Sequence, residues 1–277
     1  MVIQNLSGLF LRLKEPFDFS FLKDFGEVFK VFDDQDSGNI CFGVARGSRK
    51  YFVKFAGAPT AEYDGSISGA VERLRAAAQV YEDLRHNNLV SLVTDRDLGS
   101  GFALVFEWEE GICLGKQYPG HRRFIKASLS QRMQVFEDIL SFHLHAVGRG
   151  YVAIDFYDGS ILYDFERNRT VICDVDFYQK QPVINKMGRM WGSSRFMSPE
   201  ELTLGSQVDE ISNVFLMGAT AFALLGGELD RSIQKWIASQ KLHAIALKAV
   251  SESRKDRFQT LEAFADAWRT TSSDSPS

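Results

Sequence analysis

Cysteines are few in this sequence, and long apolar runs and an excess of basic charge are absent. The three cysteines, Cys41, Cys113 and Cys173, are scattered and form no CxxC pair, which excludes a disulfide framework or a cysteine-based zinc site. A formal net charge of -4 argues against a nucleic-acid-binding surface, because such a surface normally carries a basic stripe. We therefore expect no nucleic-acid partner.

The longest apolar run, residues 214–227, is shorter than the roughly 20 residues that a helix needs to cross a bilayer. This run is predicted to be a buried helix. The N-terminus shows no basic segment followed by an apolar stretch, so no signal peptide is evident. Together these features predict a cytoplasmic protein without a membrane partner.

Phenylalanine, by contrast, is abundant, with 23 residues in a chain of 277. This number predicts a large core that is rich in aromatic rings. The length is sufficient for one large domain or for two closely joined lobes.

The first third of the chain is predicted to be rich in strands. A helix is predicted at residues 67–85, because its apolar positions recur at helical spacing. Runs of apolar residues bounded by turn formers predict strands on both sides of this helix. They lie at residues 27–32, 40–45, 50–55, 89–94 and 102–108.

After residue 108 the pattern becomes mainly helical, with a helix at 131–146 and short strands and loops at 150–176. The sequence therefore predicts an α+β fold with two lobes. A small antiparallel β-lobe would cover residues 1–108 and a larger helical lobe residues 109–269. The tail at 270–277 is expected to be disordered.

Residues 51–54 read YFVK and resemble the VAIK motif on the third strand of the protein-kinase family. Burying a lysine on such a strand is costly unless its charge is compensated. The resemblance implies that Lys54 contacts the α- and β-phosphates of ATP, takes part in catalysis and pairs with a helix glutamate. Glu72 lies at the usual distance along the chain, whereas the LRHNNLV segment at 84–90 would place that glutamate near Ala77. We choose Glu72.

Residues 104–108 read LVFEW and resemble the strand that leads into the kinase hinge, with Phe106 as the gatekeeper. The backbone after it would face the adenine ring. The turn at 33–38 retains only the last glycine of the glycine-rich loop. Beyond Lys54 and Glu72, the resemblance thus implies ATP binding by Gly38, Ile40, Phe106, Glu107 and Trp108.

The segment at 152–164, VAIDFYDGSILYD, resembles the kinase catalytic loop HRDLKPENILLD. Asp155 falls on the catalytic aspartate, which accepts or orients the proton of the substrate hydroxyl. Ser160 falls on the asparagine that binds metal in kinases.

Residues 171–178, VICDVDFY, resemble the strand and the DFG motif that follow. Asp176 keeps the Asp-Phe pair, whereas Asp174 keeps the apolar run and the usual interval from Asp155. We favour Asp174 as the main Mg²⁺ ligand, with Asp176 as a second carboxylate. With Asp158 these aspartates form a dense acidic group that would raise each other's pKa unless a cation were present, which predicts a metal site.

Three later segments resemble structural motifs of eukaryotic-type protein kinases. They are GSSRFMSPEE at 192–201, VDEISNVFLMG at 208–218 and KDRF at 255–258. The resemblance implies a buried, structural ion pair between Glu200 and Arg257.

The kinase pattern fails around the nucleotide. The turn at 33–38 carries three aspartates where free backbone N–H groups normally hold phosphate. Phe52 replaces a small alanine on the adenine wall, Tyr157 replaces the lysine that steadies the γ-phosphate, and Asn213 replaces an aspartate that braces the catalytic loop.

Three functions are consistent with these patterns. We favour a divergent serine/threonine protein kinase that uses ATP and Mg²⁺ on a protein substrate. The first alternative is a pseudokinase that binds a regulatory protein partner, which the substitutions around the nucleotide favour. The second is a small-molecule phosphotransferase, against which the SPE segment at 198–200 argues.

Overall fold

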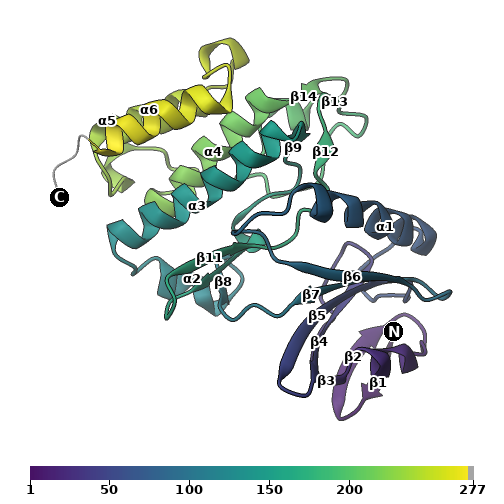
Figure 1. Ribbon diagram of the computed structural model, residues 1–277. Coiled ribbons are helices and arrows are strands. Elements are labelled where there is room, and N and C mark those ends of the chain that lie inside the picture. Colours follow the sequence, from purple (N-terminus) through teal and green to yellow (C-terminus); the bar gives the residue numbers. More distant parts are fainter. Residues whose placement is uncertain (274–277) are drawn as a thin grey trace. The chain divides into compact units, whose positions relative to one another are not determined.

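The computed structural model describes residues 1–273, which divide into two compact units. The first contains Met1–Arg85 and Val90–Glu109, and the second contains His86–Leu89 and the chain from Glu110 onward. Strands dominate the first unit and helices the second, so the fold is α+β (Figure 1).

The first unit is built on a five-stranded antiparallel sheet in the order β3-β4-β5-β7-β6. All five strands were predicted, but β6 lies three residues later than expected at both ends. The strands are β3 (Glu27–Phe32), β4 (Asn39–Arg46), β5 (Arg49–Ala56), β6 (Leu92–Asp97) and β7 (Phe102–Glu107).

The two faces of this sheet have different partners, because successive side chains of a strand point to opposite faces. Val53 and Phe55 of β5 lie in a hydrophobic core with residues of the N-terminal segment. Helix α1 (Ile67–Asp83) contacts the other face, where the ring of Tyr81 lies 4.7 Å from that of Phe106.

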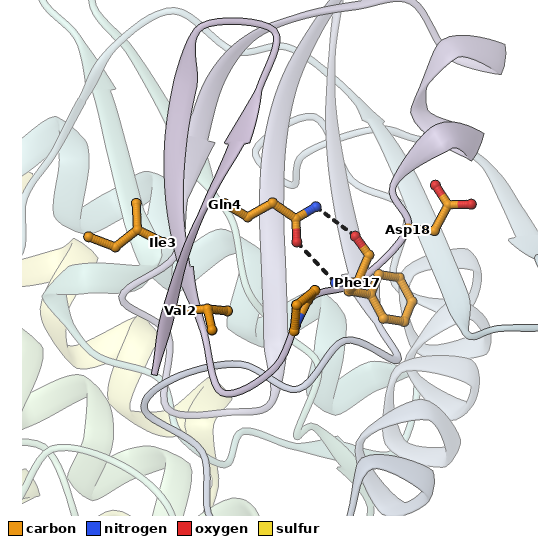
Figure 2. Close-up of a pocket in the computed structure, with 6 residues that line it drawn as sticks. Val2, Ile3, Gln4, Phe17 and Asp18 are labelled. Atoms are coloured by element: carbon orange, nitrogen blue, oxygen red, sulfur yellow. Dashed lines mark hydrogen bonds between the residues drawn. The ribbon is translucent and has the colours of Figure 1, made fainter.

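The N-terminal segment forms a hairpin that the sequence did not predict, β1 (Val2–Leu6) with β2 (Leu9–Leu13), followed by the 3-10 helix η1 (Ser20–Asp24). The Gln4 amide fixes this hairpin to the backbone of Phe17. Its Nε2 donates to the Phe17 carbonyl at 2.6 Å and its Oε1 accepts from the Phe17 N–H at 3.0 Å (Figure 2).

The second unit is organised around helix α4, whose residues are nearly all buried from Ser212 to Leu225. This confirms the predicted buried helix. A capping box formed by Asp209 and Ser212 fixes its start. The helices are α2 (Pro119–Phe124), α3 (Leu129–Gly148), α4 (Glu210–Leu225), α5 (Gln240–Ala249) and α6 (Leu261–Ser273).

The loops of this unit are connected by short strands. They are β8 (Ile112–Cys113), β9 (Tyr151–Val152), β10 (Ile161–Asp164), β11 (Arg169–Ile172), β12 (Gln179–Lys180), β13 (Val183–Ile184) and β14 (Gln207–Val208). Between β9 and β10 lies the catalytic-loop segment, which includes the 3-10 helix η2 (Asp158–Ser160).

Helix α6 continues to Ser273, so the prediction of disorder is wrong for residues 270–273. The apolar face of α6, with Phe264 and Trp268 buried, extends the helix into the polar tail. The rest of the predicted tail, 274–277, lies outside the described residues. Within residues 1–273, no helix combines the length and the apolar character that crossing a membrane requires.

Candidate active site

The candidate residues are divided between the two units. Lys54 lies in the middle of β5, in register with Cys41 of β4 and Leu104 of β7. Its side chain points to the same face of the sheet as Phe52 and is only 7% exposed. Lys54 is therefore a buried lysine on a central strand, as the sequence predicted.

The assignment of Glu72 as the partner of Lys54 is wrong. The buried stripe of α1 consists of Ala70, Leu74, Ala77, Val80 and Tyr81. Glu72 is exposed and lies on the opposite side of α1 from that stripe, so its carboxylate points away from the sheet. The alternative position, Ala77, is fully buried in the stripe but carries no carboxylate. The buried stripe of α1 thus contains no acidic residue.

Gly38, the last glycine of the shortened glycine-rich loop, packs closely against other residues of the first unit. Gly38 has φ +84°, and a Cβ at this position would lie 2.8 Å from the Cβ of Ala70 and from the ring of Tyr63. Close packing against Ala70 of α1 and against Tyr63 therefore explains why position 38 holds a glycine. Asp33, one of the three aspartates, is bound by the backbone and guanidinium of Arg12 at 2.7 and 3.2 Å.

The prediction that Ile40 contacts ATP is also wrong. Its side chain is fully buried in the core on the opposite face of the sheet from Lys54. The register explains this, because Ile40 pairs with Phe55 whereas Cys41 pairs with Lys54. The β4 residues on the Lys54 face are Asn39, Cys41, Gly43 and Ala45.

Aromatic rings cover the sheet face around Lys54. The ring of Phe52 lies 5.6 Å from Phe32 and 6.4 Å from Phe106. A second pair, Phe29 and Trp108, lies 5.0 Å apart. Phe52 is thus one of several aromatic rings on the sheet face where the resemblance would place adenine.

The second pair encloses Gly43 of β4. A Cβ there would lie 2.7 Å from the Phe29 ring and 3.0 Å from that of Trp108. The side chain of Trp108 therefore belongs to the aromatic rings that cover this face of the sheet, whereas the side chain of Glu107 is exposed.

In the second unit, Asp155 lies in the loop between β9 and β10 and has a left-handed backbone conformation, with φ +64°. The loop is braced by α4, because Oδ1 of Asn213 accepts a hydrogen bond from the Ala153 N–H at 3.0 Å. A neutral amide thus makes the contact that an aspartate makes in kinases.

Asp174 follows β11 and is also left-handed, with φ +79°. It is exposed, whereas Asp176 is half-buried in the next turn. Burial, followed by the charges of Asp174 and Asp155, raises the pKa of both Tyr157 and Tyr178. The charges of the two aspartates therefore raise the pKa of the same two phenols, although Asp155 and Asp174 are 19 residues apart in the sequence.

The donor set fits a metal that is shared with phosphate better than one bound by protein alone. No group of three acidic, cysteine or histidine side chains in residues 1–273 is arranged to hold a metal ion. Mg²⁺ commonly takes one or two carboxylates together with phosphate oxygens. Asp174, with Asp176 nearby, meets this requirement, and the Ser160 Oγ is a buried oxygen without a hydrogen-bond partner among the described atoms.

Asp158 does not belong to the acidic group that the sequence suggested. Both of its oxygens accept hydrogen bonds from Arg195, at 2.8 and 2.7 Å. Arg195 also lies 3.4 Å from Glu228, which in turn pairs with Lys116. No motif identified Arg195 in advance, because its role depends on a contact over 37 residues.

A second contact that the sequence did not reveal lies behind the catalytic loop. The imidazole of His143 is fully buried between the Ile139 carbonyl at 2.8 Å and the Tyr178 hydroxyl at 2.9 Å. Burial lowers the pKa of His143 to about 4, so the ring is neutral at physiological pH. It packs edge-on against Phe156, next to Asp155.

The predicted ion pair between Glu200 and Arg257 is present and buried. The guanidinium donates to both carboxylate oxygens, at 2.7 and 3.0 Å, and is fully shielded from solvent. Arg254 adds a third contact to Glu200 at 2.8 Å. Burial alone would raise the pKa of Glu200, but the hydrogen bonds and charge of Arg257 lower it.

The neighbouring Glu201 is a buried carboxyl group that forms no ion pair among residues 1–273. Its Oε2 accepts hydrogen bonds from the N–H and hydroxyl of Ser198, both at 2.7 Å. Burial raises its pKa from 4.5 to about 7. The folded chain therefore holds this proton more tightly than the unfolded chain, and the resulting stabilisation is complete below pH 4.5 and is lost as the pH rises through 7.

We expect the wild type to lose stability relative to Glu201→Gln as the pH rises from 5 to 8, by roughly 1–3 kcal/mol. Glutamine keeps an acceptor for Ser198 and does not ionise. Urea unfolding at several pH values measures the difference. The matched control is Glu262→Gln, at an exposed position of α6. Parallel stability curves for wild type and Glu201→Gln would refute the assignment.

Comparison with known proteins gives one distant relationship, and no family model matches the chain. Over 221 residues, or 69% of this chain, the sequence is 25% identical to the serine/threonine-protein kinase PrkC of Bacillus subtilis (strain 168). The chain spans about a third (32%) of the length of that curated relative. With this similarity, the β-rich unit followed by a mainly helical one is a protein-kinase-like α+β fold.

Proposed function

We propose that the chain binds ATP and Mg²⁺ and slowly transfers the γ-phosphate to a serine or threonine hydroxyl of a protein. The observation that carries the proposal is the left-handed backbone of both Asp155 and Asp174. This conformation is unfavourable for residues other than glycine by roughly 1–2 kcal/mol, and strained residues of this kind cluster at active sites.

Each residue has a distinct role in the proposed reaction. Asp155 would accept or orient the proton of the attacking hydroxyl. Asp174, supported by Asp176, would hold Mg²⁺ together with the phosphates, and the ion would neutralise charge on the transferred group. Lys54 would contact the α- and β-phosphates.

Two replacements are expected to make the transfer slow. Tyr157 stands where kinases place a lysine, and its raised pKa keeps the phenol neutral, so it can donate a hydrogen bond but supplies no positive charge. Glu72, the candidate for the acidic partner of the kinase lysine, is exposed on α1 and lies outside its buried stripe. Both changes weaken electrostatic stabilisation of the transition state.

A non-catalytic binding module is the second candidate. The observation that favours it is the ring-covered sheet face formed by Phe52, Phe106, Phe29 and Trp108. If these rings fill the adenine position, the same fold would serve a regulatory protein partner without nucleotide.

Calorimetric titration with ATP in the presence of Mg²⁺ separates the two candidates. We expect saturable binding by the wild type and by the control Asp164→Asn, at the end of β10, where the side chain accepts hydrogen bonds from the Glu166 and Arg167 N–H groups and pairs with the Arg167 guanidinium. Asp174→Asn should weaken the Mg²⁺-dependent part of the ATP affinity about tenfold or more. Lys54→Met should weaken ATP binding at any Mg²⁺ concentration. The absence of binding by the wild type would refute the nucleotide-dependent function and favour the binding module.

A further inference from the structure

The segment between β12 and β14 exposes apolar and basic side chains but no carboxylate. The only acidic residues in 179–206 are Glu200 and Glu201, and both are buried. Met187 is 50% exposed, Trp191 47% and Leu204 69%. We define the 184–204 surface by its exposed side chains, Ile184, Lys186, Met187, Arg189, Trp191, Leu202 and Leu204.

This surface is part of an ordered structure, because Asn185 ties its two halves together. Asn185 is fully buried, and its Nδ2 donates to the carbonyls of Gly188, Glu200 and Glu201 at 2.7, 3.2 and 3.0 Å. Its Oδ1 accepts from the Met187 and Gly188 N–H groups.

The pairing of β13 with β14 extends the same contact (Figure 1). The Met190 N–H also donates to the Glu201 carbonyl at 2.9 Å. The residues around 184–191 are thereby held against those around 200–207, so the exposed apolar side chains of both stretches stand on a braced backbone.

The charge of this surface contrasts with that of the whole chain, whose net charge is -4. Lys186 and Arg189 are exposed, and Arg189 donates to neutral oxygens, the Gly192 carbonyl and the Ser194 hydroxyl. A fixed apolar patch marks an interaction site, and tryptophan, methionine and arginine are enriched at protein interfaces.

We propose that the 184–204 surface docks a protein partner that presents acidic and apolar side chains. The lysine and arginine select the acidic groups, and Met187, Trp191 and Leu204 bind the apolar ones. A second copy bound through the same surface fits less well, because a symmetric interface would place two surfaces of the same positive charge against each other. The docking does not depend on ATP and goes beyond the proposed phosphoryl transfer.

The test uses two fluorescent peptides of equal length, one that combines glutamate with leucine and tryptophan and one in which every glutamate is replaced by lysine. Fluorescence anisotropy measures their binding to the full chain. We expect the acidic peptide to bind at least tenfold more tightly than the basic one, with an affinity that falls as salt is added.

Two variants locate the binding. Lys186→Glu and the double variant Met187→Ser with Leu204→Ser change exposed side chains only, and each should weaken the acidic peptide about tenfold. The control combines Lys241→Glu with Leu247→Ser on α5, where Leu247 is 47% exposed. It should change the affinity by less than about twofold.

Three results would overturn the proposal. They are failure of the acidic peptide to bind more tightly than the basic one, an equal loss of affinity in the α5 control, and a concentration-dependent dimer that the 184–204 variants abolish. The last result, measured by analytical ultracentrifugation, would assign the surface to a second copy. None of these outcomes bears on nucleotide binding, which calorimetry tests separately.

Discussion

Replacement of Arg257 by methionine is expected to lower the free energy of unfolding by about 3–5 kcal/mol. The change leaves the carboxylate of Glu200 buried with only part of its compensation, from Arg254 and Ser212. It also removes the donor to the Ser251 carbonyl, which Nε of Arg257 approaches to 2.7 Å. Breaking one side of a buried pair is costly, because the remaining charge stays in a medium that solvates it poorly.

Arg269→Met provides the matched control. Arg269 pairs with Glu137 at 2.5 Å, but the two side chains are 44% and 36% exposed. Water and salt screen such a pair, so its loss should cost about 0.2–1 kcal/mol. Urea unfolding of both variants measures the contrast, and equal losses would show that the Glu200 network does not hold the helical unit together.

The strands of the first unit could be predicted because their composition and turns agree. Residues 27–32 form β3 with the expected bounds. The hairpin of β1 and β2 could not be predicted, because the order of apolar and polar residues along it does not match the order of buried and exposed side chains. Gln4 points inward and is satisfied by the Phe17 backbone, whereas Ile3 and Phe10 are 69% and 68% exposed. A polar residue inside and apolar residues outside reverse the usual pattern of a half-buried strand.

The candidate site could be predicted where short motifs fix the chemistry and not where orientation decides it. The pair of Glu200 with Arg257 follows from local sequence and is confirmed, whereas the roles of Asp155 and Asp174 stay predictions. Counting from Lys54 suggested Glu72, but counting does not reveal which face of α1 meets the sheet. The prediction that Ile40 contacts ATP failed for a related reason, because a shift of one residue in register moves a side chain to the other face of the sheet.

Asp155→Asn is expected to lower the rate of phosphoryl transfer by about 100- to 10,000-fold, the usual contribution of general acid–base catalysis. Asparagine cannot accept the proton of the attacking hydroxyl, but it tolerates the left-handed conformation that Asp155 adopts. The variant should therefore fold like the wild type, which urea unfolding can verify. Asp164→Asn, changed at the last residue of β10, should transfer phosphate at the rate of the wild type.

The most direct test of the account is the transfer of labelled γ-phosphate from ATP, with Mg²⁺, to serine or threonine residues of the chain itself or of an added protein. Mass spectrometry identifies the residues that receive it. The account predicts slow, Mg²⁺-dependent transfer by the wild type and by Asp164→Asn, and a signal at background for Asp155→Asn. Equal signals from the wild type and Asp155→Asn would contradict the catalytic role of Asp155, and with it the proposed kinase activity.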